Sequence, residues 1–280
     1  MLASARVKQV AVCGFDAFNM ESARAVVSAA RHLGAPVFLQ AGIESARYMG
    51  MAMAGVILTE AARSSDVEIC IHLDHGPEPS DPHELREAIG FGFESIMVDG
   101  SSLPLEENIA LCRTVAEVAH PLGICVEGEL GRVSRNPKAT PEELRSLMTD
   151  PDQAAAFVER SGVDYLAVSV GSVSGFHDVS AGIRLDLDLL RRIRDRVACP
   201  LVFHGGTGIP ADQLREAILL GVAKINIAHG FRKAFLDGAD AYLRKTEGAS
   251  DPREALREAQ DAAMQYAVEK IGQVTGRTSD

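Results

Sequence analysis

Histidines and carboxylates stand at the ends of short apolar runs in this chain. The segments His72–Gly76 and His204–Gly206 are the clearest cases. Imidazole and carboxylate groups that converge from different strands are the ligands zinc uses when it keeps one position open for substrate. We therefore expect a metal-assisted catalytic site, with His75 and His204 as the strongest candidate ligands.

Strand alternation shows which of these polar side chains point inward, because successive residues of a strand face opposite sides. Leu73 faces outward with the other apolar residues of its run, which turns His72 and Asp74 toward the interior. The same argument turns inward Asp99, Glu127, Glu129, His204 and Asn226. Burying so many ionisable groups is costly unless they have a function, although a structural network of buried ion pairs is the alternative.

Two glycine-containing loops have the pattern of an anion site. The segment His204–Gly208 leads into a helix start at Ile209–Pro210, and Asn226–Gly230 leads into a second helix. Glycines let the backbone come close to an anion, and the amides at a helix start point toward it. The alternative is that the glycines only make tight turns. The candidate phosphate-binding residues are Gly205, Gly206, Thr207, Asn226, Ile227, Ala228 and His229.

These residues lie in a regular alternation of short strands and longer helices. The expected strands are Val10–Phe15, Pro36–Ala41, Glu68–Asp74, Ser95–Asp99, Ile124–Glu129, Tyr165–Gly171, Leu201–His204 and Lys224–Ala228. The expected helices are Glu21–Leu33, Glu44–Ser64, Pro82–Gly90, Leu105–His120, Pro151–Ser161, Asp186–Val197, Pro210–Leu220 and Phe231–Lys245, followed by a tail helix over Asp251–Ile271.

Eight strand–helix units predict an α/β fold, a single (β/α)8 TIM barrel with an additional C-terminal helix, as one domain over residues 1–280. An open doubly wound sheet is the alternative. It would normally carry a glycine-rich dinucleotide loop after its first strand, and Cys13–Ala17 is not one.

Composition narrows the function further. The net charge of −11 argues against nucleic-acid binding, which needs a basic surface. No apolar run approaches the roughly 20 residues that span a bilayer, and no signal peptide is expected. The five cysteines lack metal-binding spacing, which favours free thiols and a cytoplasmic location.

With these residues in hand, the chain resembles the class II fructose-bisphosphate and tagatose-bisphosphate aldolases. The resemblance extends from Ala17–Asn19 to about Gly230. The motifs that carry it are His72–Gly76, Met97–Ser101, Leu103–Asn108, Val126–Arg132, His204–Gly208 and Lys224–Ala228.

The resemblance implies a zinc-dependent, reversible aldol cleavage of a phosphorylated ketose to dihydroxyacetone phosphate and an aldehyde. Asp74 would be the general acid and base, and His75 and His204 would be zinc ligands. Further metal ligands or supporting groups would be Asp99, Glu127 and Glu129. The two glycine loops, together with Asn19 and Gly175, would hold the substrate and its phosphate. The resemblance also favours a homodimer or homotetramer.

Two positions depart from the family pattern. The sixth strand of the family usually ends in Gly-Thr-Ala-His-Gly, whose histidine is the third zinc ligand, and here Ser174 takes that place. His177 is the first candidate to replace it, with Glu127 or Glu129 as alternatives. His229 stands where the family usually has threonine, so the bound head group could differ from phosphate.

Two other mechanisms remain as alternatives. Lys224 could form a Schiff base, although its depth in the barrel favours a buried ion pair. The barrel could also bind a sugar phosphate without turning it over, with its metal site altered or lost. The segment Gly131–Thr149 is expected to act as a mobile lid, with Glu142 or Glu143 as the base that removes the substrate proton.

Overall fold

Eight parallel strands close into a barrel in the computed structural model, which describes residues 1–76, 82–134, 136, 139–172, 184–248 and 250–278. The strands follow chain order, and β8 pairs with β1 to complete the ring. Their bounds are β1 Val12–Asp16, β2 Val37–Gly42, β3 Ile69–Asp74, β4 Ser95–Val98, β5 Cys125–Leu130, β6 Tyr165–Val168, β7 Leu201–Phe203 and β8 Val222–Ile227. The predicted (β/α)8 barrel is confirmed.

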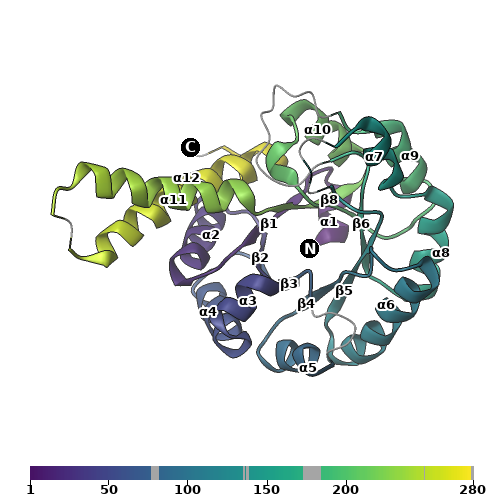
Figure 1. Cartoon of the computed structure of the whole chain (residues 1–280), viewed down its shortest axis with the longest axis horizontal. Helices are drawn as coiled ribbons and strands as arrows, with labels where there is room; N and C mark the ends of the chain where they lie inside the picture. The colour runs from purple at the N-terminus through teal and green to yellow at the C-terminus, as the bar shows by residue number, and fades with distance from the viewer. Residues whose placement is uncertain (77–81, 135, 137–138, 173–183, 249, 279–280) are drawn as a thin grey trace.

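Helices surround the barrel, and the last two extend away from it as a helical hairpin (Figure 1). The α-helices are α1 Leu2–Val7, α2 Met20–Leu33, α3 Ile43–Met49, α4 Met51–Arg63, α5 Pro82–Gly90, α6 Leu105–Ala119, α7 Pro141–Ser146, α8 Pro151–Ser161, α9 Leu187–Arg194, α10 Ala211–Leu219, α11 His229–Lys245 and α12 Pro252–Thr275. Short 3-10 turns cover His120–Leu122 and Gly206–Gly208.

The helices differ from the expectations in four respects. The helix expected over Glu44–Ser64 is two helices, because Gly50 has a φ of 83° and breaks the backbone between them. Helix α11 begins at His229, two residues before the expected start. Helices α1 and α7 were not expected at all, and the tail helix runs further than predicted.

Two apolar clusters hold the fold together. One fills the layer between the strands and the surrounding helices. The other lies inside the barrel, where Phe38, Tyr165 and Val202 pack against Leu2 and Ala5 of α1. Helix α1 therefore closes the end of the barrel where the strands begin, which leaves the carboxyl ends of the strands as the place for polar chemistry. Within the described chain, none of the helices combines the length and apolar character that crossing a bilayer requires.

Candidate active site

Asp74 ends β3 and is held by two side-chain amides. Gln40 Nε2 donates to Asp74 Oδ2 at 3.0 Å, and Asn226 Nδ2 donates to Asp74 Oδ1 at 2.9 Å. Burial would raise the pKa of Asp74, but the charge of His75, the nearby His72 side chain and the charge of His204 outweigh it and hold the pKa below its usual range. Asp74 is therefore an ionised carboxylate with a fixed orientation.

His75 and His204 bring their rings together beside Asp74, with centroids 4.9 Å apart. His75 follows the strand in the left-handed region, with a φ of 47°, which a non-glycine residue adopts only under local strain. Its Nδ1 lies 2.9 Å from Asp99 Oδ2, and His204 Nε2 lies 2.9 Å from Glu127 Oε1. Each ring is thus oriented by a carboxylate from another part of the barrel: Asp99, directly after β4, orients His75, and Glu127 of β5 orients His204.

Those two carboxylates decide which ring nitrogens carry protons. Burial would raise the pKa of Asp99, but the hydrogen bond from His75 outweighs it and lowers the pKa. Burial would likewise raise the pKa of Glu127, but the Lys224 charge outweighs it and lowers the pKa to about 2. Both groups are therefore acceptors. His75 Nδ1 and His204 Nε2 are therefore the donors to these carboxylates, and the opposite nitrogen of each ring is the one that could bind a metal.

The donor set fits a divalent metal. Candidate ligand atoms of Asp74, His75 and His204 lie within 4.8 Å of one another, and so do those of His75, Asp99 and Glu129. Glu129 Oε2 is buried without a hydrogen-bond partner among the described residues. Burial and the charge of Asp99 raise the pKa of Glu129 to about 7. Oriented imidazoles beside an unpartnered carboxylate oxygen are the surroundings in which proteins hold zinc.

Lys224 lies beneath this site in a buried polar network. Its Nζ is 2.6 Å from Glu127 Oε2 and 3.0 Å from His72 Nε2, with all three side chains fully buried. The network extends from His72 Nδ1 to Ser95 Oγ, which lies 2.7 Å away, and from Ser95 to the Tyr165 hydroxyl. The expected buried ion pair of Lys224 is confirmed. Glu127 and His72 bind this amine below the open end of the barrel, where the strands end. This position disfavours the Schiff-base alternative.

The two predicted anion loops lie against each other. Gly205 has a φ of 73°, and a Cβ on Gly206 would overlap Ile225 Cγ2 and lie 3.1 Å from Asn226 O. These positions therefore require glycine. The loop after β8 enters α11 at His229, so the amides of the first turn of α11 lie beside the loop after β7. Ile227 is buried and Ala228 is the residue before α11.

The structure leaves several of the predicted site residues untested. Ser174, Gly175 and His177 lie outside the described residues. Asn19 uses its side-chain oxygen to cap α2 through Ser22 N at 2.8 Å, so its substrate contact stays a prediction. His229 is exposed at the start of α11, and its role at the head group also stays a prediction.

The expected lid carries a helix of its own. Glu142 and Glu143 begin α7, and Glu143 caps that helix by accepting from Thr140 N at 2.6 Å. The end of the segment is tied to the barrel, because Thr149 Oγ1 donates to Leu130 O at 2.6 Å. A catalytic role for either glutamate stays a prediction.

Two functional groups escaped the sequence analysis. Gln40 faces Asp74 from β2, and Asp16 ends β1 with its carboxylate almost fully buried. Asp16 accepts from Gly42 N at 2.6 Å, from Ser45 Oγ at 3.2 Å and from Arg232 Nε at 2.9 Å. It therefore ties the first two strands to the first turn of α11. Strand alternation turns Gln40 inward, whereas Asp16 lies one residue beyond the expected first strand.

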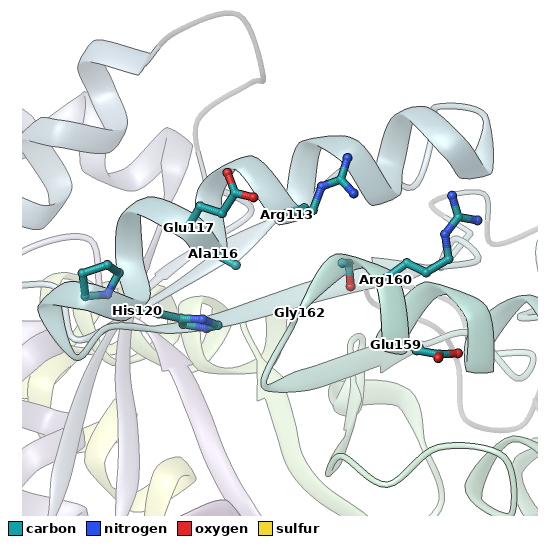
Figure 2. A pocket seen from close by; sticks show the side chains of 9 residues that line it. Arg113, Ala116, Glu117, His120, Glu159, Arg160 and Gly162 are labelled. Atoms are coloured by element: carbon teal, nitrogen blue, oxygen red, sulfur yellow. The ribbon is translucent and has the colours of Figure 1, made fainter.

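A separate pocket of ≈ 360 Å³ lies between α6 and α8, as Figure 2 shows. Its lining includes Arg113, His120, Arg160 and Gly162. His120 and Gly162 precede β5 and β6, so this pocket is at the opposite end of the barrel from Asp74. We assign it no part in the chemistry of the site.

Comparison with known proteins identifies the group to which this barrel is related. The family model of the class II fructose-bisphosphate aldolases matches residues 1–278. The chain belongs to this family. The D-tagatose-1,6-bisphosphate aldolase subunit GatY of Klebsiella oxytoca is 34% identical over 277 residues, which are 99% of this chain and 95% of that protein.

Solved structures agree with this membership. The YdjI aldolase of Escherichia coli K12 superposes with a TM-score of 0.85 at 32% identity, covering 98% of this chain and 94% of that one. The fructose-bisphosphate aldolase of Campylobacter jejuni has a TM-score of 0.82 at 22% identity, covering 100% and 94%, and shows the shared fold alone. The resemblance found in the motifs is confirmed, and the chain is a class II aldolase, a metal-dependent lyase.

Proposed function

We propose that this class II aldolase uses zinc and reversibly cleaves a phosphorylated ketose to dihydroxyacetone phosphate and an aldehyde. The observation that carries the proposal is the convergence of Asp74, His75 and His204 at the carboxyl ends of the strands, within 4.8 Å of one another. The anion loops after β7 and β8 lie on the same face of the barrel. The tagatose-bisphosphate aldolase among the relatives supports a phosphorylated ketose as the substrate class.

His75 Nε2 and His204 Nδ1 would hold the zinc, because the opposite nitrogens are bound to Asp99 and Glu127. His177, which lies outside the described residues, stays the first candidate for the third ligand, and Glu129 is the alternative. When bound, the ion would act as a Lewis acid toward the ketose carbonyl.

Asp74 would move the proton of the reaction. As an ionised carboxylate it can accept the proton of the C4 hydroxyl during cleavage and return it to the aldehyde oxygen during condensation. Gln40 and Asn226 hold one carboxylate oxygen each, so the orientation of the base is set before substrate arrives. Burial of the carboxylate excludes water that would compete for the proton.

The phosphate of the dihydroxyacetone half would bind where the two loops meet. The backbone of Gly205, Gly206 and Thr207 would approach it from one side, and the segment Asn226–His229 at the start of α11 from the other. Backbone amides at a helix start favour an anion without any basic side chain, which suits a chain with a net charge of −11. Asn19 and Gly175 are proposed as further substrate contacts.

Substituting Asp74→Asn tests the catalytic assignment. We expect kcat for cleavage of tagatose or fructose 1,6-bisphosphate to fall about 10²- to 10⁴-fold, because the amide cannot accept the proton. Zinc content should stay that of the parent protein. Asp66→Asn, at an exposed aspartate, is the control and should change neither quantity. A variant that keeps more than a tenth of the activity would remove Asp74 from the proton-transfer role.

Metal analysis tests the zinc site. Protein purified without chelator should hold close to one zinc per chain, lose activity with a chelator and regain it with zinc. His177→Ala and Glu129→Gln should differ, and the variant that loses zinc identifies the third ligand. His32→Ala, at an exposed histidine on α2, is the control. Less than about 0.2 zinc per chain, without activity on added zinc or cobalt, contradicts the proposal.

We also propose that the chain forms a homodimer or homotetramer. Leu236 and Leu243 are 67% and 56% exposed on α11 and lie seven residues apart, on one face of the projecting hairpin. An exposed apolar face of this kind supports self-association. The mass of the particle by light scattering checks it, and a monomer at micromolar concentration contradicts it.

For the cellular location we propose the cytoplasm. The support is that all five cysteines are free thiols, since a reducing compartment keeps them so.

A further inference from the structure

The loops that would bind phosphate are joined to the tail of the chain by a pair of hydroxyl groups. Thr207 lies in the loop after β7, and its Oγ1 accepts a hydrogen bond from Gly230 N in the first turn of α11 at 3.3 Å. The Tyr266 phenol of α12 lies beside the same threonine and the same glycine. Three segments that are far apart in sequence therefore meet at this threonine.

Gly230 shows how closely these groups pack. A Cβ at this position would overlap the Tyr266 hydroxyl and lie 2.9 Å from Thr207 Cγ2. The phenol thus occupies the space that a side chain would take, and only glycine allows the contact. Burial raises the pKa of Tyr266 to about 12, so the phenol keeps its proton at neutral pH.

The position of Tyr266 is set by the scaffold and not by the loops. Ala259, Ala263 and Ala267 are fully buried along one side of α12, and Ile271 is almost so. The two helices of the hairpin pack so closely that a Cβ on Gly238 would lie 2.6 Å from the backbone oxygen of Glu258. A closely packed helix therefore presents the phenol to the loops.

The hydroxyl of Thr207 is engaged by this arrangement. It accepts a hydrogen bond from Gly230 N and lies beside the Tyr266 phenol, so we take its contribution to an anion to come from the backbone of its loop. A loop that binds through backbone amides depends on how accurately its backbone is placed. Whatever fixes Thr207 also fixes those amides.

We propose that Tyr266 is a positioning residue of the phosphate site, which acts through Thr207 to hold the loop after β7 against the first turn of α11. This inference rests on the proposed function, because it takes the two loops to be the phosphate site. It gives the C-terminal helix a part in substrate affinity, although the helix carries none of the groups assigned to the chemistry.

Tyr266→Phe tests the inference, because phenylalanine keeps the ring and removes the hydroxyl. We expect the KM for fructose or tagatose 1,6-bisphosphate to rise about three- to tenfold, the effect of one hydrogen bond, with kcat within about twofold. Inorganic phosphate should bind more weakly by the same factor, seen as a smaller phosphate-dependent rise in Tm. Tyr242→Phe is the control, since that phenol bonds Glu254 within the same hairpin.

A double-variant cycle separates positioning from general stability. If Tyr266 acts through Thr207, then Thr207→Val should raise KM similarly, and the Tyr266→Phe/Thr207→Val protein should be no worse than Thr207→Val alone.

Three results would overturn the inference. One is a Tyr266→Phe protein with a lowered Tm but unchanged KM and phosphate affinity, which shows a purely structural role. Another is additive losses in the double variant, which show independent action. A parent protein that neither binds inorganic phosphate nor cleaves either bisphosphate overturns the proposed function together with this inference, and so is distinct from the first two.

Discussion

The Asp74 carboxylate is oriented by amides whose own oxygens have no hydrogen-bond partner among the described residues. Gln40 Oε1 and Asn226 Oδ1 are buried and accept no hydrogen bond from the described residues. A Cβ on Gly14 would overlap Gln40 Oε1 and lie 2.8 Å from Asn226 Oδ1, so glycine makes room for both side chains. Each buried acceptor without a partner costs about 1–3 kcal/mol. The fold accepts that cost and keeps both amide donors on Asp74.

Gln40→Met measures how much the amide donor of Gln40 contributes to kcat. Methionine has a similar size but offers no donor, so Asp74 loses one of its two amide bonds. We expect kcat to fall about tenfold, which corresponds to about 1.4 kcal/mol of transition-state stabilisation. Zinc content should not change, because the bond of Gln40 goes to Asp74 and not to a histidine. Gln153→Met, at an exposed position on α8, is the control. An unchanged kcat would show that Asn226 alone orients Asp74.

The sequence predicted the grouping of Asp74, His75 and His204 because they end strands whose alternation is unambiguous. Asp16 was missed because the first strand was expected to stop at Phe15, which left its carboxylate in a loop. Gln40 was missed because an uncharged polar residue in an apolar run gives little signal. Its role is visible only in the folded sheet, where β2 pairs with β3. This pairing sets Gln40 opposite His72 and brings Asp74 within hydrogen-bonding distance of the Gln40 amide.

At the scale of elements, local signals account for most of the barrel. Strand runs, prolines at helix starts and turn glycines are all local, so the eight strands could be found from the sequence. Helix α1 could not, because it is short and Leu2 and Ala5 become buried only against the inside of the barrel. Helix α7 had a signal that was overlooked, since Thr140 and Glu143 form a capping box.

Gly206→Ala tests how closely the loop after β7 must approach β8. The new methyl group would overlap Ile225 Cγ2, and the carbonyl of Asn226 leaves little room for it to move. We expect a loss of about 1–3 kcal/mol in the free energy of unfolding, the usual cost of overpacking, and weaker binding of inorganic phosphate. Urea unfolding and the phosphate-dependent Tm measure the two effects.

Gly90→Ala is the matched control for that substitution. Nothing lies within 4 Å of a Cβ at Gly90, which ends α5, and its φ is not in the left-handed region. Its stability should be equal to that of the parent or slightly higher, since alanine restricts the unfolded chain. If the two variants behaved alike, close packing at Gly206 would not matter to the loop.

At the scale of the whole molecule, the site and the barrel are stabilised by the same buried charges. Lys224 of β8 bonds Glu127 of β5, Glu127 bonds the His204 ring after β7, and Lys224 also bonds His72 of β3. The network therefore crosses the barrel interior between four strands. Because these groups are buried, water cannot solvate their charges. Each group therefore depends on the presence of the others.

Lys224→Met follows from this dependence. The variant keeps an apolar chain of similar length but leaves the Glu127 carboxylate buried without the lysine charge that faces it. Removing one partner of a buried ion pair costs about 3–5 kcal/mol, and we expect that loss in the free energy of urea unfolding. Lys233→Met, at an exposed pair with Asp237, makes the same substitution and should cost at most about 1 kcal/mol.

A second variant shows whether the loss of stability comes from the unbalanced charge or from poorer packing. Lys224→Met/Glu127→Gln removes both charges, so much of the stability should return, because no unpaired carboxylate remains in the interior. The glutamine can also place its amide nitrogen toward His204, which would disturb the ring that Glu127 orients. We therefore expect the double variant to fold well but to bind zinc about 10- to 100-fold more weakly, as when other carboxylates behind a metal-binding histidine are removed. A single variant as stable as Lys233→Met, or a double variant no more stable than the single one, would show that the buried charges do not depend on each other.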